Sequence, residues 1–108
     1  MRRGDIFRVP KPRQDDPKRY QFFVVVSRQD LVDSSYSTVV CAPIYTRGHE
    51  LSTEVPAGMS EGLKHDSWIA CDNLRSISKS ELTQFVGALS KAKTEELNLA
   101  LAFALDLD

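Results

Sequence analysis

The side chains best suited to chemistry on a phosphate are concentrated in the first 19 positions of this 108-residue chain. This segment holds seven basic and three acidic residues, a local charge of +4, whereas residues 20–108 hold seven basic and twelve acidic residues, a charge of −5. A guanidinium group can hold two phosphate oxygens at once. The segment therefore indicates either a polyanionic partner such as nucleic acid or a solvated basic loop.

The other reactive side chains give no sign of a metal site, a cofactor or a hydrolase triad. His49 and His65 are separated by sixteen positions and lack the closely spaced partners typical of a zinc site. Cys41 and Cys71 lie in apolar, strand-like stretches outside any C-x-x-C pair, so we expect two buried, reduced thiols. No serine stands in a Gly-x-Ser-x-Gly context. The sequence predicts neither a cofactor nor a bound metal.

The composition is typical of one ordinary globular domain. Hydrophobic residues make up 42% of the chain and charged residues 27%, which argues against a disordered or fibrous protein. No apolar run approaches the roughly 18 residues that span a bilayer. The start of the chain, MRRGDIFRVPKPR, lacks the apolar stretch of a secretory signal. We expect a single domain over residues 1–108 that acts in the cytoplasm, away from the membrane.

The elements that must position any site are mostly short strands. Residues 4–9 predict a first strand, and residues 10–19 are too rich in proline and charge to continue it. Aromatic and β-branched residues over 20–27 predict a central strand. Further strands are predicted at 37–44, 51–55, 67–71 and 84–89.

Helical signals occur in the second half of the chain. Ser78 and Glu81 fit a capping box for a short turn, and a helix is predicted over 91–105 with Ser90 or Thr94 as its N-cap. Five side chains give this helix an apolar face for the sheet: Leu97, Ala100, Leu101, Ala104 and Leu105. Ala102 and Phe103 widen that face, as a partner subunit would require. Five or six short strands with one terminal helix predict a small antiparallel barrel or curled sheet of class α+β.

Several segments, taken in order along the chain, are similar to one family. RRGDIFRV, a polar loop, FFVVVSRQ, STVVCAPI, LKHDSWIACDNLRSI and KSELTQFVGALS together resemble the MazF/PemK toxins of bacterial type II toxin–antitoxin modules. The resemblance implies an SH3-like, barrel-shaped sheet with short helices and a C-terminal helix, forming a homodimer. It also implies metal-independent cleavage of single-stranded RNA at short sequence motifs, inhibition of translation and growth, and inhibition by a cognate antitoxin.

The resemblance points to one arginine and one threonine as the catalytic pair. The family usually has an arginine at the start of the second strand, a position that falls on Phe22 here, and the nearest arginine is Arg19. The usual hydroxyl position at the end of the third strand falls on Tyr45, and Thr46 follows it. A one-residue displacement reverses a side chain within a regular strand but not beyond its end or at a bulge. Arg19 and Thr46 both border predicted loops, so we expect them to reach one groove.

Metal-free RNA cleavage uses the 2′-hydroxyl of the substrate as the nucleophile and leaves a 2′,3′-cyclic phosphate and a 5′-hydroxyl. Arg19 would stabilise the phosphorane-like transition state, and Thr46 would donate a hydrogen bond to the scissile phosphate. No residue is an obvious general base. His49, in a predicted loop just after Thr46, is the first candidate, whereas His65 is expected to be structural or exposed at the rim.

Basic and aromatic side chains near this pair would bind the RNA. The candidates are Lys18, Arg28 and Arg47 for phosphates, Tyr20 and Tyr45 for stacking on unpaired bases, and His49 beside them. Trp68 is expected to pack in the core or at a dimer interface. Two alternatives remain open: a small-barrel toxin that poisons a protein target such as DNA gyrase, and a catalytically inactive relative that only binds RNA or an antitoxin.

Overall fold

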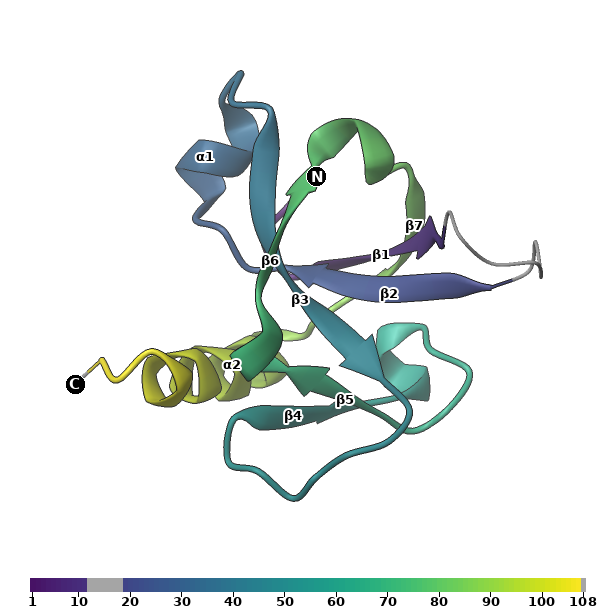
Figure 1. Cartoon of the computed structure of the whole chain (residues 1–108), viewed down its shortest axis with the longest axis vertical. Helices are drawn as coiled ribbons and strands as arrows, with labels where there is room; N and C mark the ends of the chain where they lie inside the picture. Colours follow the sequence, from purple (N-terminus) through teal and green to yellow (C-terminus); the bar gives the residue numbers. More distant parts are fainter. Residues whose placement is uncertain (12–18, 108) are drawn as a thin grey trace.

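The body of the molecule is one curled antiparallel sheet, to which seven strands of the described residues contribute (Figure 1). The structure is a computed structural model that describes residues 1–11 and 19–107. The main path of the sheet runs β4-β5-β3-β2-β1-β7, and β6 pairs with β3 outside this path. The strands are β1 (Asp5–Pro10), β2 (Tyr20–Val25), β3 (Thr38–Tyr45), β4 (Glu54–Ala57), β5 (Ser67–Ala70), β6 (Arg75–Ser78) and β7 (Gln84–Ala88).

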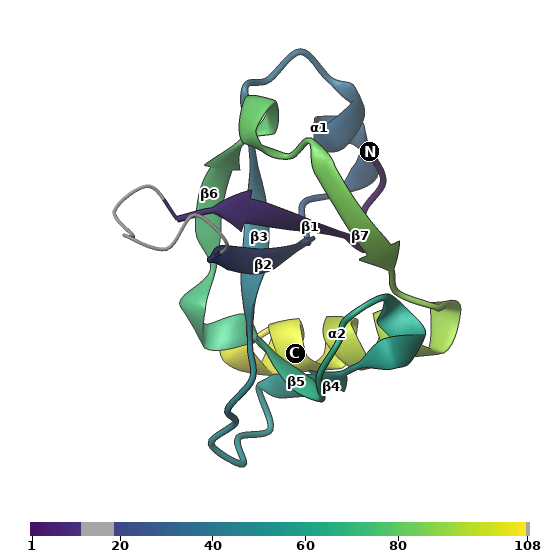
Figure 2. The ribbon, with the colours of Figure 1, turned by 90° about the vertical axis from the view of Figure 1, so that its right-hand side faces the viewer.

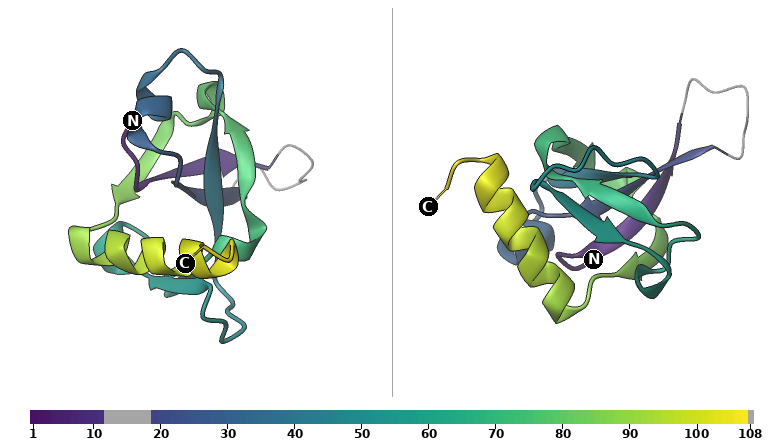
Figure 3. Two further views of the ribbon diagram at one scale, coloured as in Figure 1. Left: turned by 90° about the vertical axis from the view of Figure 1, so that its left-hand side faces the viewer. Right: turned by 90° about the horizontal axis from the view of Figure 1, so that it is seen from below.

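Helices occupy two ends of this sheet. The α-helices are α1 (Gln29–Asp33) and α2 (Lys91–Ala104), and the 3-10 turns are η1 (Met59–Glu61), η2 (Cys71–Asn73) and η3 (Lys79–Glu81). Figure 2 shows α2 beside β4 and β5 at one end of the molecule, with α1 at the other end. Both views of Figure 3 show α2 running across this end, and its contacts are with η2 and β4. Among the described residues, no helix has the length and apolar character needed to cross a membrane.

The alternation of side chains along the strands divides the interior into two cores. On β2, Val24 faces one core, whereas its neighbours Phe23 and Val25 face the other. The α2 core contains Ile6, Val24, Val26, Ala42, Ile44, Val55, Ala57, Leu63, Ile69, Cys71, Leu97 and Ala100. The α1 core contains Phe7, Phe23, Val25, Val32, Val39, Cys41 and Leu82. Each central strand therefore serves two cores at once, which explains why β2 and β3 are so rich in apolar residues.

Strand β3 is the structural hub of the sheet. Its first half pairs with β6, from Thr38 opposite Ser78 to Cys41 opposite Arg75. Its second half pairs with β5 on that side, while β2 pairs along the other side. The strand can hold three partners because its eight residues allow two short strands to share one edge.

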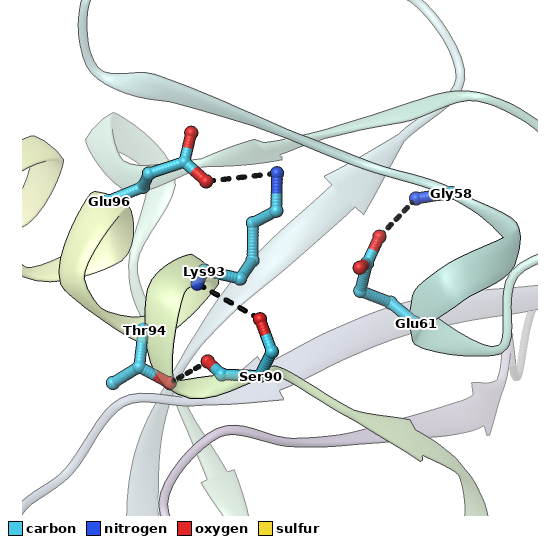
Figure 4. A network of polar contacts seen from close by, with 6 residues as sticks. All are labelled: Gly58, Glu61, Ser90, Lys93, Thr94 and Glu96. Carbon is cyan, nitrogen blue, oxygen red and sulfur yellow. Dashed lines mark hydrogen bonds and ion pairs between the residues drawn. The ribbon is translucent and has the colours of Figure 1, made fainter.

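Helix α2 begins at a clear cap (Figure 4). The Ser90 hydroxyl accepts the backbone N–H of Lys93 at 3.1 Å, and the Thr94 hydroxyl donates to the Ser90 carbonyl at 2.8 Å. Of the two predicted caps, Ser90 is therefore the correct one. Leu97 and Ala100 are buried as predicted, but Leu105 is 53% exposed because the helix ends at Ala104.

The predicted strands are confirmed with shifted ends, and β4 begins at Glu54 rather than at residue 51. Four elements were not predicted from the sequence: α1, β6, η1 and η2. The turn at η3 exists, but the Ser78 side chain makes no cap hydrogen bond and lies 2.9 Å from the Ser80 hydroxyl. The two cysteines are free and buried as expected, and burial raises the pKa of Cys41 to about 12.

Candidate nucleic-acid interface

A groove of about 1040 Å³ opens where one face of the sheet extends beyond the α2 core. Phe22 of β2 and Ile44 of β3 line its base, and both also belong to or pack against that core. Tyr20 lies two positions before Phe22, at the start of β2, and Thr46 lies two positions after Ile44, directly beyond the end of β3; both line the groove. Because side chains two residues apart share a face of a strand, the apolar pattern of the core continues directly into the groove.

The segment that follows η1 supplies a wall of the groove through Gly62, Leu63, Lys64, His65 and Ser67. The η1 turn is closed by the buried Glu61, whose carboxylate accepts the backbone N–H of Gly58 at 2.7 Å (Figure 4).

Backbone at the end of this turn approaches β7 closely. Gly62 has a φ of +92°, a conformation that favours glycine. A Cβ at Gly62 would stand 2.5 Å from the carbonyl oxygen of Val86, and one at Gly87 would stand 2.1 Å from that of Glu61. Two glycines therefore set the position of this wall against β7.

The groove is strongly basic although the whole chain carries a charge of −1. Four lining residues are cationic: Arg8, Lys11, Arg19 and Lys64. Among the described residues that line the groove, none is an aspartate or a glutamate. Charges of one sign in a concave site attract counter-ions of the other sign, so the groove is suited to a polyanion.

The two residues of the predicted catalytic pair line this same groove. Arg19 directly precedes β2, and its carbonyl accepts the backbone N–H of Lys11 at 3.4 Å. Thr46 directly follows β3, which ends at Tyr45. Thr46 and Ile44 line the groove together, whereas Tyr45 lies opposite Trp68 of β5 and is not among the lining residues. Thr46 follows by one residue the position at which the family usually has its hydroxyl, and its side chain still lines the groove.

The other predicted RNA-binding residues are spread more widely. Tyr20 lines the groove, but the guanidinium carbon of Arg8 lies 4.5 Å from the centre of its ring. Arg28 occupies the N-cap position of α1 without a side-chain cap hydrogen bond, and it is not among the groove-lining residues. Arg47 is exposed beyond Thr46 and is likewise not a lining residue. Lys18 lies outside the described residues.

His49, the first candidate for a general base, is not among the described residues that line the groove. Its backbone N–H donates to the Glu54 carboxylate at 2.9 Å and 3.1 Å, and the N–H of Leu51 donates to the same group at 3.0 Å. Hydrogen bonding from Leu51, then from His49, lowers the pKa of Glu54 below its usual value. The loop that carries His49 is therefore organised around Glu54.

Trp68 is half-buried, as a packing role requires. A Cβ at Gly48 would stand 2.7 Å from the indole nitrogen of Trp68, so this loop passes directly over the ring. Arg75 of β6 lies over Phe23, with its guanidinium carbon 6.0 Å from the ring centre.

Most groove-lining residues were missing from the sequence-based set, and five of them carry polar, charged or aromatic side chains from β1, β7 and the segment after η1: Arg8, Lys64, His65, Gln84 and Phe85. Arg8 shares a strand face with Ile6, and this alternation could have assigned it to the same face as the α2 core. No local sequence pattern predicts that the other four residues line the groove. The pairing of β1 with the distant strand β7, together with the η1 turn, brings them there. Among the described residues, no three His, Cys, Asp or Glu side chains gather in a way that could hold a metal ion.

The curled antiparallel sheet, the terminal helix and the cationic groove without described carboxylates define a small barrel-like protein whose groove is suited to a polyanion. The chain belongs to the PemK-like, MazF-like toxin family of type II toxin–antitoxin systems, whose sequence model matches residues 2–105. The resemblance found in the sequence segments is thereby confirmed, and so is the expected fold class.

Individual relatives agree with this assignment. Endoribonuclease MazF3 of Mycobacterium tuberculosis is 33% identical over 85 residues, which cover 79% of this chain and 82% of that protein. The structure of Mycobacterium tuberculosis toxin MazF-mt6 is 27% identical with a TM-score of 0.82, covering 96% of this chain and 98% of that one. A mycobacterial endoribonuclease in complex with its cognate antitoxin is 26% identical with a TM-score of 0.83, covering 100% and 97%.

Proposed function

We propose that this protein is the toxin of a type II toxin–antitoxin pair and acts as an endoribonuclease. It cleaves single-stranded RNA, messenger RNA included, at short sequence motifs, and so inhibits translation and growth. The observation that carries the proposal is that Arg19 and Thr46 line one basic groove in a member of a family with a relative named as an endoribonuclease. A backbone of phosphates is the polyanion that such a groove attracts.

The reaction proposed for this groove needs no metal ion. The 2′-oxygen attacks the adjacent phosphorus, the O2′–P bond forms and the P–O5′ bond breaks, which leaves a 2′,3′-cyclic phosphate and a 5′-hydroxyl. Arg19 holds the non-bridging oxygens, on which negative charge accumulates in the transition state. The Thr46 hydroxyl donates a hydrogen bond to the same phosphate and positions it.

Two proton movements accompany this reaction, since the 2′-hydroxyl loses a proton and the 5′-oxygen gains one. Imidazole is the side chain that readily takes up and releases a proton near neutral pH. Among the described residues that line the groove, His65 is the one imidazole. We therefore assign proton transfer to His65 in this proposal, in place of His49.

The proposed assembly is a cytoplasmic homodimer that a cognate antitoxin inhibits. Support for the dimer comes from α2, where Leu99 is 75% exposed and Phe103 is 65% exposed beside Val55 and Pro56 of β4. Support for the antitoxin comes from the similar mycobacterial endoribonuclease, whose structure contains one. An acidic antitoxin segment fits the charge of the groove. Sedimentation of the wild type and of Phe103→Ser tests the dimer, which the substitution should weaken.

The decisive experiment incubates purified protein with varied single-stranded RNAs in EDTA and maps the new ends. We expect cuts at one recurrent short motif with cyclic-phosphate ends, and a loss of about 100-fold in rate for Arg19→Gln and for Thr46→Val. Arg75→Gln is the matched control, because this arginine lies over Phe23 and outside the groove lining.

Intact RNA with folded wild-type protein would overturn the proposal. Growth arrest on expression with intact messenger RNA and stalled replication would instead identify a gyrase-type poison. Binding of single-stranded RNA without any cut would identify an inactive relative.

A further inference from the structure

We propose that Arg8 is a second guanidinium at the scissile phosphate, where it holds non-bridging oxygens together with Arg19, and that Gln84 is the residue that positions it. The inference rests on the proposed function, because it adds a catalytic residue to that same reaction. The bonds that form and break are unchanged, and Arg8 neither donates nor accepts a proton. Three observations carry it: the place of Arg8 in the groove, the way its side chain is held, and the charge around it.

The register of the strands places Arg8 in the middle of the groove. It lies opposite Gln84 of β7 on one side and opposite Phe22 of β2 on the other. Phe22 in turn lies opposite Ile44 of β3. Residues paired in this way share one face of a sheet, and all four line the groove. Arg8 therefore belongs to the row of side chains that crosses the base of the groove.

The side chain of Arg8 leans along the groove toward the proposed catalytic pair. Although Arg8 is paired with Phe22, its guanidinium carbon lies 4.5 Å from the centre of the ring of Tyr20, two residues earlier in β2. Tyr20 directly follows Arg19 in the chain. If the register of β2 with β3 is continued by two residues beyond Phe22, Thr46 comes opposite Tyr20. Because adjacent strands are about 4.8 Å apart, a phosphate bound beside Tyr20 adjoins Arg8, Arg19 and Thr46.

Arg8 is held in place before any ligand arrives. Its Nε donates to the side-chain oxygen of Gln84 at 2.9 Å, and its guanidinium lies over the ring of Tyr20. Binding through an ordered side chain costs less conformational entropy than binding through a mobile one. Charges that are oriented in advance are also the ones that stabilise a transition state most effectively. Gln84 therefore acts through Arg8, as a positioning residue.

The charge of Arg8 is not neutralised by these partners. Gln84 and Tyr20 are both uncharged, and no acidic residue is among the described residues that line the groove. Within the part of the chain that the structure describes, the Nη atoms of Arg8 make no hydrogen bond. The two Nη groups together present the forked donor pair that matches two phosphate oxygens.

The test measures kcat and KM for cleavage of a short single-stranded RNA that carries the motif cut by the wild type. The variants are Arg8→Gln, Arg8→Lys and Gln84→Met, and urea unfolding verifies that each is folded. The matched control is Arg75→Gln, which removes the arginine that lies over Phe23 of the α1 core.

Each variant has its own expected result. Arg8→Gln should lower kcat by about 100-fold with little change in KM, because the second negative charge on the phosphate arises only in the transition state. Arg8→Lys should lower kcat by about 10-fold or more, because an ammonium group cannot replace the fork. Gln84→Met keeps the charge of Arg8 but removes its acceptor. It should lower kcat by about 10-fold, and the salt dependence of RNA binding should stay as in the wild type.

Sulfur substitution at the scissile phosphate separates direct contact from an indirect effect. Two substrates are compared, each with sulfur in place of one non-bridging oxygen. We expect the wild type and Arg75→Gln to cleave one of them at least about fivefold more slowly than the oxygen substrate, the effect of one weakened hydrogen bond. This penalty should disappear in Arg8→Gln. A penalty of equal size in Arg8→Gln and the wild type would show that Arg8 does not contact this phosphate.

Two failures can be told apart. Wild-type protein that cuts no RNA overturns the proposed function and the role of Arg8 together. Wild-type protein that cuts RNA, with an equal kcat in Arg8→Gln, overturns the role of Arg8 alone. A loss confined to KM does the same, because Arg8 would then bind a phosphate that does not react. If Arg8→Gln does not fold, a kcat of Gln84→Met equal to that of the wild type overturns the inference.

Discussion

The contact between η1 and β7 yields the sharpest prediction for stability, the substitution Gly87→Ala. The added methyl group would stand 2.1 Å from the carbonyl oxygen of Glu61 and 2.9 Å from its carbonyl carbon. Ordinary van der Waals contact begins near 3.4 Å, so the two backbones must separate by more than an ångström. Neither contact atom belongs to a side chain that could turn away. The substitution therefore lowers the free energy of unfolding, partly through backbone strain and partly through displacement of β7 from η1.

Overpacking of this kind typically costs about 1–3 kcal/mol. With a urea m-value of about 2 kcal/mol/M, a loss of about 2 kcal/mol lowers the unfolding midpoint by about 1 M. Gly58→Ala is the matched control, because its new Cβ would stand 3.2 Å from a side-chain oxygen of Asp66 and no closer than 4.0 Å to the backbone of that residue. All variants are compared at one protein concentration, because association would shift the apparent stability.

The same substitution should also impair the groove while the protein remains folded. Gly62 and Val86 both line the groove at this contact, so separating η1 from β7 moves one wall. We expect weaker binding of single-stranded oligonucleotides by Gly87→Ala in the absence of urea, with Gly58→Ala binding as the wild type does. A midpoint for Gly87→Ala equal to that of Gly58→Ala would refute the close approach on which this reasoning depends.

Three further predictions concern the rest of the molecule. Hydrogen bonds from Leu51 and then from His49 lower the pKa of Glu54 in the folded protein. The ionised Glu54 therefore stabilises the folded protein at any pH above the pKa that Glu54 has in the unfolded chain. This stabilisation is lost as the pH falls through the pKa that Glu54 has in the folded protein. Urea midpoints measured from about pH 6 down to about pH 3 should therefore fall less steeply in Glu54→Gln than in the wild type. Burial raises the pKa of Cys41 to about 12, and burial followed by the charge of Asp72 raises that of Cys71 to about 11. A thiol reagent should thus label both cysteines only on unfolding, and rapid labelling of the native protein would contradict this. Ser90→Ala removes the cap of α2 and should cost about 1 kcal/mol in urea unfolding, whereas Thr94, which donates to a carbonyl instead, is not the cap.

Much of the fold could be predicted because local composition and tertiary burial agree. The apolar and β-branched residues of β2 and β3 fill two cores at once, so these strands have a strong sequence signal. Strand β6 lacks such a signal, since its four residues, RSIS, include one apolar side chain and pair with a distant strand. Helix α1 is likewise set by tertiary contacts, because the Gln29 side chain accepts the backbone N–H of Arg3.

The groove was harder to predict than the fold. The resemblance of the sequence segments predicted that Arg19 and Thr46 reach one groove, which both of them line, and the end of β3 at Tyr45 explains why a hydroxyl shifted by one residue still reaches it. The contribution of β7 could not be foreseen in the same way. The pairing of Arg8 with Gln84 joins residues 76 positions apart, and a bulge between Ile6 and Phe7 shifts the register of the strands.

That long-range pairing has a consequence for the bacterial cell that makes the protein. One edge of the groove is formed by the paired strands β1 and β7. Leu97 and Ala100 of α2 complete the α2 core, against which the groove lies. Since β7 is among the last elements to be synthesised, the arginines near the start of a nascent chain leave the ribosome well before the groove can form. We therefore expect a chain that stops before β7 to lack this edge of the groove and to leave RNA uncut.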